Sequence, residues 1–281
     1  MSSIASRHLP RRASHYLRRR AVRLLVRLWL ARASDAPILL TSIPKCGTNL
    51  LRGLLRLLPP LRLATELPRN EQSTPQEILS VLQAARGRFV VGHIPHTPNN
   101  AAVVAEAKAM VLHVVRDPRA YVVSLVHHIH RFPDHALHSH FRDHVPDFEA
   151  AAELVIRGVH LGEGGFLPDV ATFFGWYLGW RGCPSAYTTT YEALVGPTGG
   201  GSRTAQHHEV TAILTHLGYR GVNPTVVTLL ASLLYHRDSP TFRRGVLGDW
   251  RGCFTPRLRQ AFRETAPGLL GELGYEPGDE W

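Results

Sequence analysis

A loop of small and polar residues follows an apolar segment near the start of the chain. Residues 37–42 have the pattern of a buried strand, and Pro44-Lys45-Cys46-Gly47-Thr48-Asn49 leads from it into a helix that begins at Asn49. A strand-to-helix turn that contains glycine directs backbone N–H groups and the positive end of the helix dipole at one spot. The loop therefore predicts a phosphate site, with Lys45 stabilising a leaving oxygen and Thr48 donating a hydrogen bond. Taken alone, it also fits an ordinary connection, and the Walker A pattern is absent.

Three other groups of residues are suited to related chemistry. Arg116 comes directly after an apolar segment, with Ser124 eight residues later, and a guanidinium forms paired hydrogen bonds with phosphate oxygens. Near the C-terminus, a second basic pair stands in the run 242–251, whose letters are F-R-R-G-V-L-G-D-W-R. Histidine titrates near neutrality, so His93, in the segment 92–95, is a candidate for taking a proton from an acceptor group.

Alternating strand and helix patterns carry these residues. The predicted strands are 37–42, 89–91, 110–115 and 186–190, and the predicted helices include 75–85, 120–130, 169–181, 209–217 and 225–235. This alternation predicts an α/β fold, a single P-loop-like domain with a central parallel sheet flanked by helices. Ligands bind at the carboxyl ends of strands in such sheets. Because the loop, His93 and Arg116 each follow a predicted strand, we expect them to form one site.

The positive charge of the chain is concentrated at its start. The net charge is +10 over 281 residues, but nine arginines and one aspartate give residues 1–36 a formal +8, which leaves +2 for the rest. We therefore expect a basic extension over 1–36, a catalytic domain over 37–281, and no nucleic-acid binding by that domain. Three cysteines without metal-ligand spacing favour a reducing, cytoplasmic compartment. No apolar run has the ~18–20 residues that a membrane-spanning helix needs.

Residues 15–32 have the pattern of a basic amphipathic helix. Leu17, Ala21, Leu24 and Leu28 recur on one helical face, and four arginines lie on another. Three interpretations stay open: the helix makes peripheral contact with an anionic membrane, docks on a partner, or packs on the domain as its first helix. An arginine-rich, acid-poor start also resembles an organelle transit peptide.

Together, the four motifs resemble those of the PAPS-dependent sulfotransferases, specifically the cytosolic type. In that family a P-K-S-G-T-T loop binds the 5′-phosphosulfate of 3′-phosphoadenosine 5′-phosphosulfate (PAPS). An arginine followed eight residues later by a serine binds the 3′-phosphate, as does R-K-G-x-x-G-D-W-K, and the histidine of K-T-H-L-P is the general base. The motifs occur here in the same order, over residues 37 to about 275.

The resemblance implies a sulfotransferase that moves a sulfuryl group from PAPS to a hydroxyl or amine by in-line transfer. The product is 3′,5′-adenosine diphosphate (PAP), and no metal is expected. The acceptor, a small molecule or a peptide, is not identified. The resemblance makes His93 the general base and Lys45 a catalytic residue at the leaving group. The residues implied to bind the donor are Lys45, Cys46, Gly47, Thr48, Asn49, Arg116, Ser124, Tyr191, Arg243, Arg244 and Gly245.

The sequence also departs from the family pattern. Leu50 stands where many members have a tryptophan against the adenine, and Val91 stands where K-T-H-L-P has its lysine. The family's dimerisation motif is altered at Pro256 and Gln260, which leaves the oligomeric state open.

A histidine-rich segment follows Arg116. Eight of the 17 histidines lie between His127 and His160, so a metal site is conceivable there. We favour an acceptor pocket built from this segment and from aromatic residues in and beyond it, namely Phe132, Phe141, Phe148, Phe166, Phe173, Phe174 and Trp176. Two other functions are considered: a nucleotide-dependent kinase, which would need the missing Walker A loop, and a non-catalytic protein that binds membranes or nucleic acid through residues 1–36.

Overall fold

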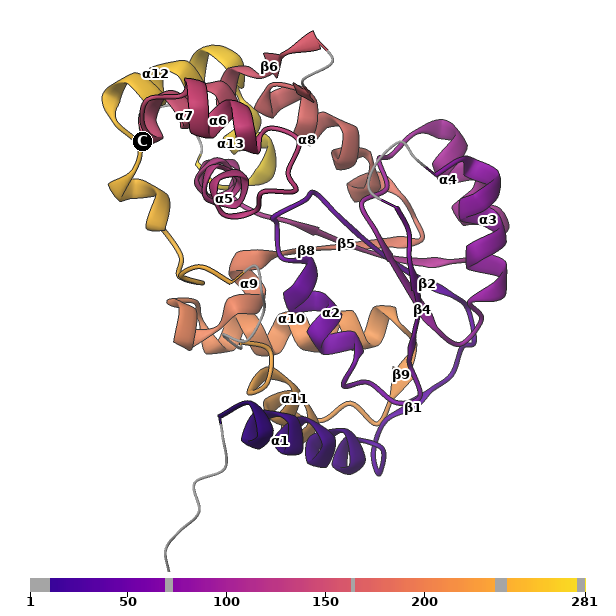
Figure 1. The fold of residues 1–281 in the computed structure, drawn as a ribbon. Helices are drawn as coiled ribbons and strands as arrows, with labels where there is room; N and C mark the ends of the chain where they lie inside the picture. The colour runs from indigo at the N-terminus through magenta and orange to yellow at the C-terminus, as the bar shows by residue number, and fades with distance from the viewer. Residues whose placement is uncertain (1–10, 69–72, 163–164, 236–241, 277–280) are drawn as a thin grey trace, which may run out of the picture.

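A five-stranded parallel sheet forms the centre of the protein. The computed structural model describes residues 11–68, 73–162, 165–235, 242–276 and 281 (Figure 1). The sheet has the strand order β3-β4-β2-β5-β8. Its strands are β3 (Leu63–Glu66), β4 (Phe89–Gly92), β2 (Ile38–Ser42), β5 (Met110–Val115) and β8 (Ala186–Thr190). The predicted α/β fold with a central parallel sheet is thus confirmed.

Helices cover both faces of this sheet, as Figure 1 shows. Side chains alternate along a strand, so Ile38 and Leu40 of β2 face one side and Leu39 faces the other. The first side is covered by α1 (Arg11–Val26), α2 (Thr48–Leu55), α10 (Arg203–His216) and α11 (Pro224–Ala231). The second side is covered by α3 (Pro75–Ala84) and α4 (Pro98–Glu106).

A third apolar core lies beyond the carboxyl ends of the strands, in the upper left of Figure 1. It is built by α5 (Pro118–Arg131), α6 (His138–His144), α7 (Phe148–Arg157), α8 (Val170–Leu178), α12 (Pro256–Thr265) and α13 (Leu269–Leu273). Tyr121, Phe141 and Phe174 are fully buried in it. This helical layer forms one wall of the space above the strand ends.

The remaining elements are short. Two small antiparallel pairs join β1 (Ala31–Arg32) to β9 (Tyr219–Arg220) and β6 (Val159–His160) to β7 (Phe166–Leu167). Helix α9 (Tyr191–Val195) follows β8, and 3₁₀ turns lie at Gly179–Gly182, Pro197–Gly199 and Asp249–Gly252. Strand β3 and the small pairs are not predicted from the sequence, because edge strands with half-exposed side chains have no continuous apolar run.

Local capping explains where the site helices begin. Asp117 is the N-cap of α5: its side chain accepts a hydrogen bond from the backbone N–H of Arg119, and Pro118 takes the first helical position. Thr190 caps α9 in the same way by accepting from Ala193. These caps end β5 and β8 sharply, and therefore place Arg116 and Tyr191 at the edge of the sheet.

Helix α1 packs against the domain through one face. Val22 and Val26 are buried in the same core as β2. Arg19 donates hydrogen bonds to the carbonyl oxygens of Gly53 and Leu233, and Arg23 donates to two carbonyls beyond the end of α2. Within the described residues, we find no helix with the length and apolarity needed to cross a bilayer.

Candidate active site

A cavity of about 860 Å³ is lined by the residues that follow β2, β4, β5 and β8. The structure brings eleven of the twelve sequence-predicted site residues to its lining: Lys45, Gly47, Thr48, Asn49, His93, Arg116, Ser124, Tyr191, Arg243, Arg244 and Gly245. Four strand ends and the C-terminal motif therefore converge on one space.

The phosphate loop has an unusual backbone. Lys45 has φ 68° and Gly47 has φ 117°, both in the region that favours glycine. A Cβ at Gly47 would lie 3.1 Å from Cδ2 of Tyr191, so glycine also allows the loop to approach that ring. The N-terminus of α2 has no side-chain cap. This arrangement leaves the start of α2 directed at the cavity that Thr48 and Asn49 line.

Cys46 is the predicted site residue that does not line the cavity. Its side chain is fully buried in the third core, and its backbone N–H donates to the carbonyl of Ile43. Burial raises the pKa of the thiol well above its usual value. Cys46 therefore supports the turn from the side of the core. Neither its thiol nor its backbone N–H is directed into the cavity where the nucleotide is expected.

A chain of polar contacts joins the loop to His93. Nδ1 of His93 lies 2.8 Å from the carbonyl oxygen of Ser42 and 3.2 Å from its hydroxyl, which in turn lies 2.6 Å from the hydroxyl of Thr48. Because a carbonyl only accepts, Nδ1 carries the proton, and in that neutral tautomer Nε2 holds the lone pair. The ring is thus held in the form that a general base requires.

Arg116 is buried beside Tyr191. Its side chain is only 9% exposed, its guanidinium carbon lies 4.3 Å from the centre of the Tyr191 ring, and its Nε has no hydrogen-bond partner among the described residues. Burial is the main reason that the pKa of Tyr191 is raised, so this ring stays neutral under the guanidinium. Ser124 stands on α5 and lines the same cavity.

Asp249 holds both arginines of the C-terminal motif. The carboxylate is 4% exposed and accepts hydrogen bonds from Arg243 and, at 2.8 Å, from Arg244. Burial raises the pKa of Asp249, but the hydrogen bonds from Arg244 and Arg243 outweigh it and leave the pKa below its usual value. The carboxylate therefore stays ionised and fixes where the two guanidiniums stand.

Two glycines in this region are needed for close packing. Gly245 has φ 67°, and a Cβ there would lie 2.5 Å from the Phe242 ring. Gly199 is buried, and its carbonyl accepts a hydrogen bond of 2.9 Å from the backbone N–H of Leu247. The glycine-rich segment 196–202 therefore packs against the C-terminal motif.

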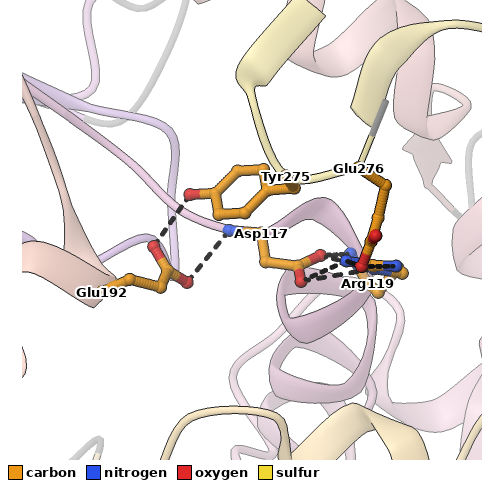
Figure 2. A network of polar contacts seen from close by, with 5 residues as sticks. All are labelled: Asp117, Arg119, Glu192, Tyr275 and Glu276. Carbon is orange, nitrogen blue, oxygen red and sulfur yellow. Dashed lines mark hydrogen bonds and ion pairs between the residues drawn. The ribbon is translucent and has the colours of Figure 1, made fainter. Parts of the chain in front are cut away.

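A network of polar contacts joins the start of α5 to Glu192 and to a segment near the C-terminus, as Figure 2 shows. Glu192 accepts hydrogen bonds from the backbone N–H of Asp117 at 3.2 Å and from the hydroxyl of Tyr275 at 2.8 Å. Arg119 pairs with Asp117 at 2.9 Å and with Glu276 at 3.4 Å. Burial is the main cause of the raised pKa of Glu192. The network therefore ties the starts of α5 and α9 to the segment 275–276 near the C-terminus.

Arg119 also connects two motifs through an aromatic contact. Its guanidinium carbon lies 3.8 Å from the centre of the Trp250 ring and 4.6 Å from that of Trp281. The sequence places Arg119 three residues after Arg116 and Trp250 directly after Asp249. The buried cation therefore holds the two predicted 3′-phosphate elements in a fixed relation.

Another part of the cavity lining is aromatic and apolar. Phe166, Phe173 and Trp176 line it, together with Tyr121 and Leu125 of α5. The other aromatic residues proposed from sequence for the acceptor pocket are not in this lining; Phe141 and Phe174 are fully buried in the third core. The ring of Phe174 lies 5.3 Å from that of Tyr121, so it packs against a residue of the lining and does not itself reach the cavity.

Two of the positions that depart from the family pattern also line the cavity. Leu50 and Val91 both do so, and the rings of Tyr235 and Phe242, 5.8 Å apart, line it as well. His128 and His135 of the histidine-rich segment reach the lining. Over the described part of the chain, no group of three or more histidine, cysteine, aspartate or glutamate residues is placed to hold a metal ion.

Several residues that shape the site are not identified by sequence reasoning. They are Ser42, Arg119, Glu192, Gly199 and Tyr275. Ser42 is the last residue of the predicted strand 37–42, and Glu192 follows the predicted strand 186–190 by two residues, so position at a strand end is a usable signal for both. One partner of Glu192, Tyr275, lies 83 residues further along the chain, and no local pattern marks it.

The family model and the curated relative that match this chain are both sulfotransferases. A model described as "Sulfotransferase domain" matches residues 35–163. The chain is 26% identical over 262 residues to sulfotransferase 2B1 of Rattus norvegicus, an alignment that covers 84% of this chain and 72% of that relative. The residues 35–163 that match the sulfotransferase domain include the phosphate loop, His93, Arg116 and Ser124.

Solved structures share the fold. Mouse sulfotransferase SULT7A1 complexed with PAP has a TM-score of 0.61 at 18% identity, covering 83% of this chain and 84% of the other. Retinol dehydratase complexed with retinol and PAP has a TM-score of 0.53 at 15% identity, covering 83% and 80%. Retinol dehydratase complexed with androsterone and PAP gives 0.51 at 14% identity over the same shares. In its motifs, in its fold and in the match of residues 35–163 to a sulfotransferase domain, the chain is similar to the PAPS-dependent sulfotransferases.

Proposed function

We propose that this sulfotransferase binds PAPS across the cavity and uses His93 as the general base toward a hydroxyl or amine acceptor. The observation that carries the proposal is the buried guanidinium of Arg116, whose Nε has no partner among the described residues. Burying an unsatisfied charged donor is costly, and a phosphate oxygen beside it would relieve that cost. Arg116, Ser124 and Arg243 line the same cavity and are proposed to enclose the 3′-phosphate.

The loop fits the other end of the donor. The start of α2 and the hydroxyl of Thr48 suit a phosphate oxygen, and Gly47 leaves room for the backbone to approach it. Bound there, PAPS would supply an activated sulfuryl group whose bond to the bridging phosphate oxygen breaks as the acceptor attacks. Lys45 would neutralise the charge that develops on that oxygen. Arg244 and Gly245 complete the donor side.

His93 is proposed to take the acceptor's proton at Nε2. The Ser42 carbonyl holds the Nδ1–H, so the lone pair lies on the opposite side of the ring. When Nε2 is protonated, the imidazolium remains hydrogen-bonded to the same carbonyl, which stabilises the positive charge. The proton therefore moves without any reorientation of the ring.

The acceptor is proposed to be a small molecule with an apolar body. Support comes from the lining by Tyr121, Phe173 and Trp176, which would bury hydrocarbon surface rather than a charged chain. The retinol dehydratase structures hold retinol or androsterone, which are molecules of this kind. Asp134 and His135, which also line the cavity, offer polar contacts at its edge.

Calorimetric titration with PAP, 5′-AMP and ATP tests the donor assignment without knowledge of the acceptor. If Arg116 and Arg243 enclose a 3′-phosphate, PAP binds at least tenfold more tightly than 5′-AMP, because a charge-assisted hydrogen bond contributes about 1.5–3 kcal/mol. Equal affinity for PAP and 5′-AMP contradicts the proposed site. Preference for ATP would favour a nucleotide-dependent kinase instead.

A further inference from the structure

Helix α1 carries a second apolar stripe on the face that points away from the protein. Leu17, Ala21, Leu24 and Leu28 follow one another at spacings of four, three and four residues, and all are exposed. Leu24 is 57% exposed and Leu28, in the turn that follows the helix, is 76% exposed. We call these four residues the outer stripe. Figure 1 places α1 along the lower edge of the molecule, with α11 on its inner side.

The inner face of the same helix is fixed to the protein. Val22 and Val26 lie about half a turn from the outer stripe and are buried in the core. Arg19 and Arg23 donate hydrogen bonds to backbone carbonyls, including that of Gly53 in α2. The outer stripe therefore does not form part of the core, because Val22 and Val26 make the core contacts of this helix.

Arginines flank the outer stripe on both sides. At 100° per residue, Arg20 and Arg27 fall on one flank and Arg18 on the other, and all three are exposed. The segment 11–34 contains no aspartate or glutamate. Trp29 follows at the end of the stripe and is 43% exposed. The segment thus combines an apolar centre, cationic margins and an indole, and it carries no carboxylate side chain of its own.

We propose that the outer stripe binds an anionic lipid surface, with α1 lying in the plane of the interface. Leucine side chains would enter the boundary between headgroups and acyl chains, and the flanking guanidiniums would contact anionic headgroups. The hydrogen bonds of Arg19 and Arg23 would hold the domain against the membrane as a rigid body, because α1 is part of it. Nothing in this proposal depends on the sulfotransferase chemistry.

A second copy of the chain fits the stripe less well. Two outer stripes facing each other would bring six arginines into one interface, with no acidic residue in segment 11–34 to pair with them. An anionic lipid surface complements both the apolar centre and its margins. The charge pattern therefore decides between the two occupants.

Sedimentation of the full chain with vesicles tests the proposal. We expect binding to vesicles of phosphatidylcholine with 30 mol% phosphatidylglycerol, at least tenfold weaker binding to pure phosphatidylcholine, and weakening as salt is raised. The double variant Leu24→Gln/Leu28→Gln is expected to lower the partition coefficient by tenfold or more. Equal binding by this variant, or no binding to the anionic vesicles at low salt, overturns the proposal.

A matched pair of charge variants separates the flank from general electrostatics. Arg20→Glu and Arg142→Glu change the net charge equally, but Arg142 lies on α6. We expect only Arg20→Glu to weaken vesicle binding by several-fold, and equal loss in both variants would contradict a defined lipid face. Sedimentation velocity without vesicles gives the remaining outcome: self-association that Leu24→Gln/Leu28→Gln abolishes would assign the stripe to a second copy. Unchanged unfolding midpoints show that the variants are folded.

Discussion

The Nδ1 atom of His93 is held 2.8 Å from the backbone carbonyl of Ser42, so a main-chain group sets the tautomer of the proposed base. A main-chain acceptor survives any side-chain substitution at Ser42. The hydroxyl of Ser42, by contrast, connects His93 to Thr48 of the phosphate loop. The same residue thus serves the base through its backbone and the loop through its side chain, and the two contributions are separable by mutation.

We expect His93→Ala to lower the turnover rate by about 10²–10⁴-fold while leaving PAP affinity nearly unchanged, because a general base acts on the acceptor's proton. Ser42→Ala is the matched variant: it keeps the carbonyl, so the rate should stay within about tenfold of wild type. Turnover is measured with any acceptor found by screening, and PAP affinity by calorimetry. Wild-type turnover in His93→Ala would remove His93 from the mechanism.

Arg243→Ala should weaken PAP binding by about 10- to 100-fold, which corresponds to the loss of one charge-assisted contact. The affinity for 5′-AMP should stay the same, since that nucleotide lacks the 3′-phosphate. In this variant Asp249 keeps its ion pair with Arg244, so we expect the C-terminal motif to keep its conformation. A parallel loss of 5′-AMP affinity, measured by the same titration, would show that Arg243 acts elsewhere.

Gly47→Ala should reduce PAP affinity by tenfold or more. The added Cβ would lie 3.1 Å from Tyr191 at a φ of 117°, so both the backbone and the ring beneath Arg116 would have to shift. Gly87→Ala is the control: it has φ 69° but no atom within 4 Å of the added Cβ. The control should lose stability of about 1–2 kcal/mol through strain alone and keep its PAP affinity. Equal PAP affinity in both variants would mean that the approach of the loop to Tyr191 is unimportant.

Glu192→Gln should change how stability depends on pH. Burial raises the pKa of Glu192 in the folded state, so between about 4.5 and that raised value the folded chain holds a proton that the unfolded chain has lost. The free energy of unfolding of the wild type therefore falls as pH rises through this window, by at most about 1.4 kcal/mol per pH unit. The variant lacks this contribution.

Urea unfolding from pH 4.5 to 8 measures the effect. The stability of Glu192→Gln relative to wild type should increase with pH and then level off. Because glutamine keeps an oxygen to accept a hydrogen bond from Asp117 or Tyr275, gross disruption of the network is not expected. A stability difference that is constant with pH would show that Glu192 has an ordinary pKa in the folded protein.

Two substitutions on α1 test whether the helix is part of the folded domain. Val26 is completely buried, so Val26→Ala should lower the free energy of unfolding by about 2 kcal/mol through lost burial and a residual cavity. Leu24→Ala, on the exposed outer stripe, should change it by no more than about 0.5 kcal/mol. Equal, small effects in urea unfolding would mean that α1 contributes little to the stability of the domain.

Much of the fold follows from patterns that are local in the sequence. The strands 110–115 and 186–190 are apolar or β-branched runs, and the structure has both at the predicted boundaries. The cavity likewise gathers residues that each follow such a strand. Position at a strand end is therefore a strong guide to shared location in a parallel sheet.

The features that escape sequence reasoning are long-range or depend on orientation. The contact of Arg119 with Trp250 and the hydrogen bond of Tyr275 to Glu192 join segments more than 80 residues apart, and nothing local selects those partners. Cys46 has the expected place in the loop but faces the core, because a turn with φ 68° at Lys45 determines the direction of the next side chain. On α1, periodicity identifies two faces but does not say which one the domain covers.

The burial of Cys46 makes the phosphate loop accessible to a chemical measurement. Its thiol is enclosed in the third core directly below the loop, so a thiol reagent reaches it only when that region opens. Cys183 and Cys253 are partly exposed and can be replaced by serine. In such a background the labelling rate of Cys46 reports the opening free energy of the loop without an added probe. Nucleotide that binds at the loop should slow the labelling in proportion to its occupancy.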